Sequence, residues 1–82
     1  MYPRELISPQ IKILKALREG PKSATELIKE TELPITTLYY NLKTLIIHGL
    51  AVKVSRGKYA ITEKGREILN KISIELTTYA KG

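Results

Sequence analysis

The sequence predicts a mainly α-helical domain with one small β-hairpin, an α+β fold in which a long helix closes the chain. Three observations predict it. Up to residue 48, apolar side chains recur at the three- and four-residue spacing of helices, in segments bounded by helix-capping residues. Between residues 50 and 61 the apolar spacing changes to two, which is typical of strands. From residue 63 the helical spacing returns and continues to about residue 79.

Clear start and stop signals bound the first two helices. Ser8 can cap the first helix, Pro9 suits its first position, and the Gly-Pro pair at 20–21 ends it. The second helix opens with Ser23 and Glu26, which have the spacing of a capping box, in which each side chain accepts a hydrogen bond from the other residue's backbone N–H. Two successive helices are therefore expected before residue 33.

A third helix is expected between Pro34 and Gly49, with Leu38, Leu42 and Leu45 on one buried stripe. A helical wheel centred on that stripe places four residues on the opposite face and three on the flanks. The opposite face carries Thr36, Tyr40, Lys43 and Ile47, and the flanks carry Thr37, Tyr39 and Thr44. Asn41 falls near the edge of the core.

The hairpin is expected to turn at the Arg-Gly pair 56–57, because glycine adopts the positive φ that tight turns require. This turn would place Val54 opposite Tyr59 and Val52 opposite Ile61, so that both apolar pairs share the core face. Lys53, Ser55 and Lys58 would then lie on the face away from the core.

The composition indicates a polyanionic partner. Of 82 residues, 14 are Lys or Arg and eight are acidic, all of them glutamate, for a net charge of +6. The absence of cysteine excludes disulfides, thiolate metal sites and thiol catalysis. No apolar run is long enough to span a membrane, and the N-terminus lacks a signal-peptide core, so a cytoplasmic, single-domain protein is expected.

Four stretches in order resemble winged helix-turn-helix DNA-binding proteins, particularly the MarR, ArsR and PadR regulators of bacteria and archaea. They are the opening helix around residues 11–17, the Ala-Thr-Glu-Leu run 24–27, the Leu-rich helix ending in Gly-Leu at 49–50, and the Tyr-x-Ile-Thr-x-x-Gly run 59–65. The resemblance covers about residues 8–72. This chain has Glu32 where the turn of such proteins usually carries glycine.

The resemblance implies that the helix 34–48 enters the major groove of double-stranded DNA and that the hairpin 50–62 is a wing that contacts the DNA backbone or minor groove. Arg56, at the hairpin tip, is the strongest candidate for the wing contact. The complete set of expected DNA contacts is Lys22, Ser23, Thr36, Thr37, Tyr39, Tyr40, Lys43, Thr44, Lys53, Arg56 and Lys58. Because the helix offers no Arg and no Gln, most of the affinity is expected from phosphates.

The last helix, about residues 63–80, exceeds what a single core of about residues 8–62 requires. Its apolar residues Ile72, Ile74, Leu76 and Tyr79 predict pairing with a second copy. A homodimer would present two recognition helices about one DNA turn apart, as a transcriptional repressor binding a palindromic site does.

Other function classes are less favoured. One His, no Asp and no Gly-rich phosphate loop give no constellation for catalysis, a metal or a cofactor, and no small-molecule effector site is evident. The main alternative is a winged helix used for protein–protein contact in transcription or replication machinery, which Ile47, expected to be exposed, would favour. RNA is a weaker alternative, because no aromatic platform lies on a sheet face.

Overall fold

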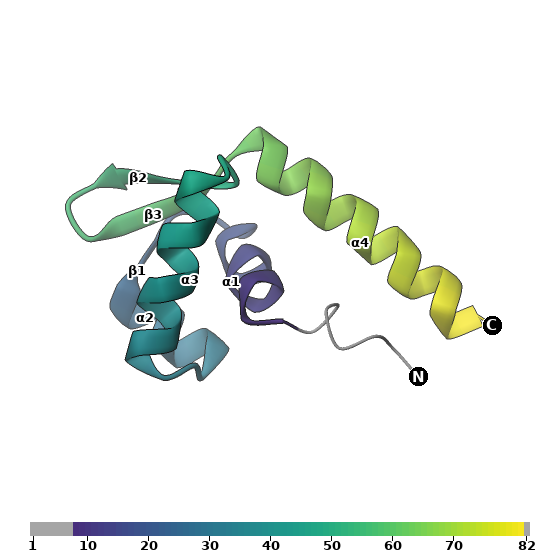
Figure 1. The fold of residues 1–82 in the computed structure, drawn as a ribbon, viewed down its shortest axis with the longest axis horizontal. Coiled ribbons are helices and arrows are strands. Elements are labelled where there is room, and N and C mark those ends of the chain that lie inside the picture. The colour runs from purple at the N-terminus through teal and green to yellow at the C-terminus, as the bar shows by residue number, and fades with distance from the viewer. Residues whose placement is uncertain (1–7, 82) are drawn as a thin grey trace.

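The computed structural model describes the backbone of residues 8–81 and the side chains of residues 8–72. In chain order the elements are α1 (Pro9–Leu17), β1 (Lys22–Ser23), α2 (Ala24–Thr31), α3 (Ile35–Ile47), β2 (Ala51–Ser55), β3 (Lys58–Ile61) and α4 (Glu63–Lys81). The β2–β3 hairpin, here called the wing, and the C-terminal end of α4 lie at opposite ends of the molecule (Figure 1). The predicted order of helix, short helix, helix, hairpin and long helix is confirmed.

The helix boundaries follow from the predicted caps. The Ser8 hydroxyl accepts a hydrogen bond from the Ile11 N–H at 3.4 Å, and Pro9 occupies the first helical position of α1. At the start of α2 the capping box forms in full: Ser23 Oγ accepts from the Glu26 N–H at 3.2 Å, and Glu26 Oε1 accepts from the Ser23 N–H at 2.9 Å. These bonds satisfy backbone donors that the first turn of a helix leaves unpaired.

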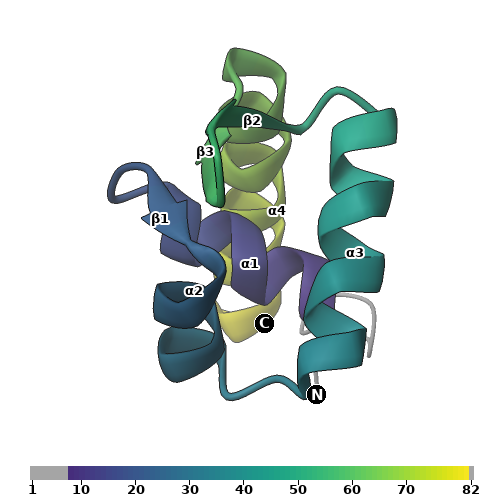
Figure 2. The ribbon, with the colours of Figure 1, turned by 90° about the vertical axis from the view of Figure 1, so that its left-hand side faces the viewer.

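One hydrophobic core joins the helices and the sheet. Its fully buried side chains are Ile13, Leu17, Leu27, Leu38, Leu42, Leu45 and Leu69. The leucine stripe of α3 therefore faces inward, as predicted, and fixes which side of that helix remains in solvent. Leu69 attaches the first half of α4 to the same core, whereas the second half extends past α1 (Figures 1 and 2).

The connection between α2 and α3 has an unusual backbone. Glu32, which follows α2, adopts the left-handed conformation with φ 58° and ψ 24°. A side chain in this region costs about 1 kcal/mol or more compared with glycine. Thr31 is buried at the end of α2, where its hydroxyl donates to the Leu27 carbonyl at 2.6 Å and accepts from the Leu33 N–H across the turn at 3.4 Å. The chain thus makes the tight helix-turn-helix connection without the usual glycine.

The sheet differs from the prediction in two ways. It has three strands, in the order β1-β3-β2, because residues 22–23 pair with β3. The predicted register of the hairpin is wrong: Ala51 pairs with Ile61 and Lys53 with Tyr59, and only the pair of Ser55 with Lys58 is confirmed. A bulge between residues 53 and 55 inserts one extra residue in β2, and a one-residue shift exchanges the two faces of a strand.

As a result of this shift, Lys53 shares a face with buried Tyr59, while Val52 and Val54 are exposed. The small Ala51, 3% exposed, takes the core position that Val52 was expected to occupy. The wing therefore presents a lysine, not a valine, on the face that continues the core.

The junction of the wing and α4 is tightly fitted. Thr62 Oγ1 donates to the Gly49 carbonyl at 2.6 Å and accepts from the Gly65 N–H at 3.1 Å, so it caps α4 and connects it to the end of α3. Gly65 is buried, and a β-carbon there would lie 2.3 Å from the Leu50 carbonyl oxygen. Only glycine lets the first turn of α4 approach the start of β2 this closely.

Candidate nucleic-acid interface

The outer face of α3, defined as Thr36, Tyr40, Lys43 and Ile47, is exposed along its whole length. Tyr40 and Ile47 are each 71% exposed. The helical wheel predicted this arrangement. No neighbouring element within the described residues covers this face, so α3 is free to contact a large partner along about three turns.

The two flanks of α3 differ in chemistry. On one flank Thr37 and Thr44 are half-buried, and the Thr44 hydroxyl donates to the Tyr40 carbonyl at 3.1 Å. On the other flank, towards the wing, Ile35, Tyr39 and Ile46 are 57%, 48% and 37% exposed. The sequence predicts exposure for Ile47 but not for Ile35 and Ile46, which a helical wheel places at the edge of the leucine stripe.

The α3–wing groove is a hollow of about 380 Å³ between α3 and the inner face of the wing. It is lined by Tyr39, Leu42, Lys43, Ile46, Ile47, Lys53 and Tyr59. The bulge in β2 turns Lys53 towards this groove, which it lines together with Tyr39 and Lys43. The sequence prediction had placed Lys53 on the opposite face of the wing.

Two further cations lie on the wing outside this groove. Arg56 is at the exposed turn of the hairpin, where Gly57 has φ 72°. Lys58 is exposed at the start of β3, opposite Ser23 of β1. Hydrogen bonds from the backbone and side chain of Ser23 lower the pKa of Glu26, and the positive charges of Lys58 and Lys22 add to this effect.

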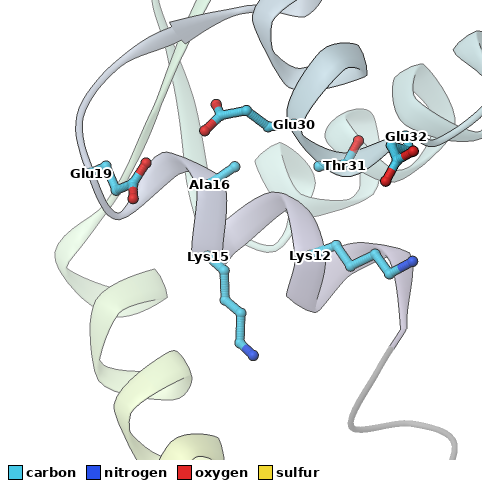
Figure 3. A pocket seen from close by; sticks show the side chains of 7 residues that line it. All are labelled: Lys12, Lys15, Ala16, Glu19, Glu30, Thr31 and Glu32. Atoms are coloured by element: carbon cyan, nitrogen blue, oxygen red, sulfur yellow. The ribbon is translucent and has the colours of Figure 1, made fainter.

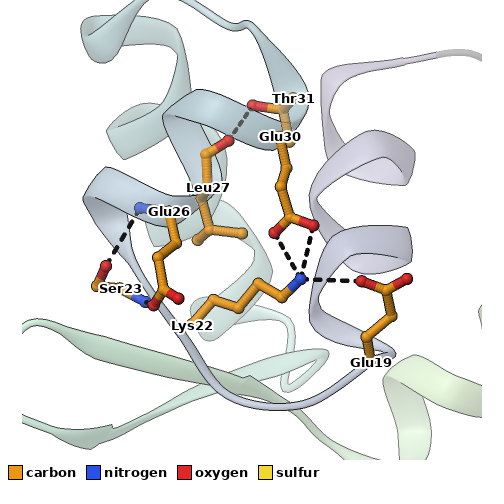
Figure 4. A network of polar contacts seen from close by, with 7 residues as sticks. All are labelled: Glu19, Lys22, Ser23, Glu26, Leu27, Glu30 and Thr31. Carbon is orange, nitrogen blue, oxygen red and sulfur yellow. Dashed lines mark hydrogen bonds and ion pairs between the residues drawn. The ribbon is translucent and has the colours of Figure 1, made fainter.

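Besides Thr44, two of the expected DNA contacts use their side chains in hydrogen bonds within the chain. The Lys22 ammonium donates to Glu30 at 2.7 Å and to Glu19 at 2.9 Å, and its side chain is only 14% exposed (Figure 4). Hydrogen bonding to Glu30 and Glu19 raises the pKa of Lys22. The hydrogen bond between Lys22 and Glu19 also lowers the pKa of Glu19. Ser23 Oγ is used in the capping box. A contact of either residue with DNA stays a prediction.

A separate hollow lies between α1 and α2, away from the wing. Its lining mixes carboxylates and lysines: Lys12, Lys15, Ala16, Glu19, Glu30, Thr31 and Glu32 (Figure 3). Among the described residues, no group of three or more His, Cys, Asp or Glu side chains is placed to hold a metal ion. No helix in that part of the chain is long and apolar enough to cross a membrane.

Comparison with known proteins agrees with this geometry. The winged helix-turn-helix family profile matches residues 4–78. Among solved structures, the transcriptional regulator BldR from Sulfolobus solfataricus superimposes with a TM-score of 0.75 at 25% identity, over 87% of this chain and 55% of BldR. Bordetella bronchiseptica BpsR, whose DNA binding is regulated by 6-hydroxynicotinic acid, gives 0.73 at 24% identity, over 89% of this chain and 58% of BpsR.

A third similar structure, T. acidophilum IdeR, gives a TM-score of 0.64 at 22% identity, over 85% of this chain and 33% of IdeR. This chain thus spans between a third and three fifths of these structures. No curated protein matches it. The fold is that of winged helix transcriptional regulators, and with the family profile matching most of its length, the chain belongs to the winged helix-turn-helix family.

Proposed function

We propose that the chain binds double-stranded DNA sequence-specifically, with α3 in the major groove and the wing against the adjacent backbone. The single observation that carries this proposal is the exposed outer face of α3 beside a wing that points Lys53 into the same groove as Lys43. The major groove of B-DNA is wide enough for one helix, and phosphates are the partners that lysine and arginine contact most often there.

The proposed contacts divide by chemistry. Tyr40 and Thr36 lie centrally on the outer face of α3, where base edges would be met, and Thr37 and Thr44 lie at its flank. The cations Lys43, Lys53, Arg56 and Lys58 would neutralise phosphates, with the Tyr39 hydroxyl as a further donor at the groove edge. The net charge of +6 supports this arrangement, because it attracts a polyanion from a distance.

Binding of the purified protein to a generic duplex tests the proposal. At about 50 mM salt we expect measurable binding, and affinity should decrease steeply as salt is added, because each neutralised phosphate releases condensed counterions. Fluorescence anisotropy of a labelled duplex at several salt concentrations measures both quantities. An absence of binding at about 50 mM salt would count against DNA.

We infer further that α4 pairs two copies of the chain. α4 has 19 residues, about 28 Å of helix, and its second half extends beyond the core (Figure 1). Ile72 packs partly against the core, whereas the side chains of Ile74, Leu76 and Tyr79 lie outside the described residues. An apolar hollow between α1, α3 and α4, lined by residues such as Ile11, Leu50 and Ile68, adds surface for a partner on this side.

Light scattering at micromolar concentration tests the dimer. A dimer should give twice the chain mass of 9.3 kDa. A mass that stays at one chain up to about 100 μM would contradict pairing through α4, since obligate dimers are formed well below that concentration.

A dimer on a palindromic site would cover promoter DNA, so we propose repression in the cytoplasm as the regulatory outcome, without a cofactor. BldR, one of the similar structures, is a transcriptional regulator, which supports the regulatory part of this proposal. Transcription in vitro from a bound promoter, with and without the protein, distinguishes repression from activation.

One observation favours a second candidate function, contact with another protein. Ile35, Ile46 and Ile47 are all exposed on α3, and apolar side chains grouped on a surface often mark a protein partner. Such an interface would show little salt dependence and no duplex binding. The four cations around α3 and the wing favour DNA.

A further inference from the structure

The outer face of α3 combines high exposure with a low capacity for hydrogen bonds to bases. The whole of α3, Ile35–Ile47 with the sequence ITTLYYNLKTLII, contains no Arg, Gln, Asp or Glu. Together with Asn and Lys, these are the side chains that read guanine, adenine and cytosine in the major groove through paired hydrogen bonds. Lys43, Thr36 and the Tyr40 hydroxyl are the polar groups that solvent reaches on this face.

The one amide on the helix is already used. Asn41 is 8% exposed, and its Nδ2 donates to the Thr37 carbonyl at 2.8 Å. To read an adenine, this side chain would have to leave the core and give up that bond, which carries a cost. The Thr44 hydroxyl likewise donates within the helix, to the Tyr40 carbonyl.

The most exposed large side chains of α3 are apolar or aromatic. Tyr40 and Ile47 are the two most exposed large apolar residues of the described chain, and they lie seven positions apart on one stripe of α3 with Lys43 between them. In the major groove, the feature that an apolar side chain can recognise is the C5-methyl group of thymine. Side chains two helical turns apart meet different base pairs.

We propose that α3 selects thymine by apolar contact of Ile47 and Tyr40 with the C5-methyl groups, so that the preferred sites are rich in A·T pairs. This inference rests on the proposed DNA binding and adds what the helix recognises there. Lys43, between the two apolar side chains, supplies attraction to phosphate without selecting a base. Specificity therefore comes from methyl burial and affinity from charge.

Replacing thymine by deoxyuridine in the duplex tests the inference, because this change removes the methyl group and leaves every base-pairing hydrogen bond. The probes are an alternating A·T duplex of about 24 base pairs, more than two helical turns, and the same duplex with deoxyuridine. Burial of one methyl is worth about as much as one methylene, so each contacted thymine should account for about a fourfold loss of affinity. An alternating G·C duplex of equal length should bind more weakly than the thymine duplex.

Two variants assign the effect to the helix. In Ile47→Ala the ratio of affinities for the thymine and deoxyuridine duplexes should decrease, because the Ile47 side chain that would contact the thymine methyl group is shortened. In the control Val54→Ala, an exposed apolar residue on the wing, the ratio should stay that of the parent. Both positions are more than half exposed, so both variants should fold.

The outcomes separate this inference from the proposed function. Equal affinity for the two duplexes, with binding still sensitive to salt, overturns thymine selection and leaves DNA binding in place. A ratio unchanged by Ile47→Ala overturns the assignment to Ile47 of α3, whatever the result for Val54→Ala. No binding to any of the duplexes overturns both proposals.

Discussion

Replacing Gly65 with alanine should lower the free energy of unfolding by about 3 kcal/mol, although alanine is normally the better helix residue by about 1 kcal/mol. The reason is that the packing of α4 on Leu50 and Ile61 leaves no room for a β-carbon at residue 65. A β-carbon at this position would lie 2.3 Å from the Leu50 carbonyl oxygen and 2.8 Å from Ile61 Cγ1. The first contact is with backbone, which cannot rotate away as a long side chain can. The start of α4 would have to move away from β2.

The movement would disturb several bonds at once, which is why a large effect is expected. Thr62 N–H donates to the same Leu50 carbonyl at 3.1 Å, and the Thr62 hydroxyl caps α4 through the Gly65 N–H. For a domain of this size, 3 kcal/mol corresponds to a decrease in melting temperature of roughly 12–24 °C.

Thermal and chemical unfolding followed by circular dichroism measure the effect. Glu67→Ala, an exposed change two residues further along α4, is the matched control and should stay within about 0.5 kcal/mol of the parent. If Gly65→Ala equalled the control, the close packing of α4 on β2 would be wrong.

The helices could be predicted because their signals are local. Ser8 and Ser23 each cap a helix through a residue three positions on, and the leucines of α3 determine its inner face through spacing alone. The same spacing located the outer face on which Tyr40 lies.

The wing could not be predicted to the same degree, because its register depends on a bulge. A turn at 56–57 fixes the pair of Ser55 with Lys58, but nothing in the Ala-Val-Lys-Val-Ser run indicates that β2 carries one residue more than β3 over the same distance. This single residue decides whether Lys53 or Val54 lies opposite Tyr59 and faces the α3–wing groove. The charge of the candidate site therefore depended on a feature beyond local sequence.

Whether the Lys22 ammonium is available to a phosphate depends on acidic side chains that only the folded chain brings beside it. Its charge and its place before α2 suggested a phosphate contact, but Glu30, eight residues further on, returns beside it once α2 has formed. The two-residue strand β1 also gives no periodic signal, since its pairing with β3 is made across the fold. The position and exposed face of α3 could therefore be predicted more accurately than the positions and partners of the cations around it.

The largest effect on DNA binding is expected from removing the four cations around the recognition helix together. Lys43, Lys53, Arg56 and Lys58 should contribute about 0.9 each to the slope of log affinity against log salt, or about 3.6 per bound chain. This slope alone corresponds to about a 150-fold loss of affinity between 50 and 200 mM salt. A variant with alanine at all four positions should lose most of the slope and bind more than a hundredfold more weakly at about 100 mM salt.

The matched control changes the same net charge elsewhere. Alanine at Lys12, Lys15, Lys29 and Lys71, four exposed lysines on α1, α2 and α4, also removes four positive charges from the chain. If overall charge caused the binding, the two variants would weaken it equally and the cations of α3 and the wing would have no special role. If phosphates lie along α3 and the wing, the control keeps nearly the parental slope, because distant charges are screened beyond about 10 Å at 0.1 M salt. The difference between the two slopes therefore measures how many phosphates the recognition helix and wing neutralise.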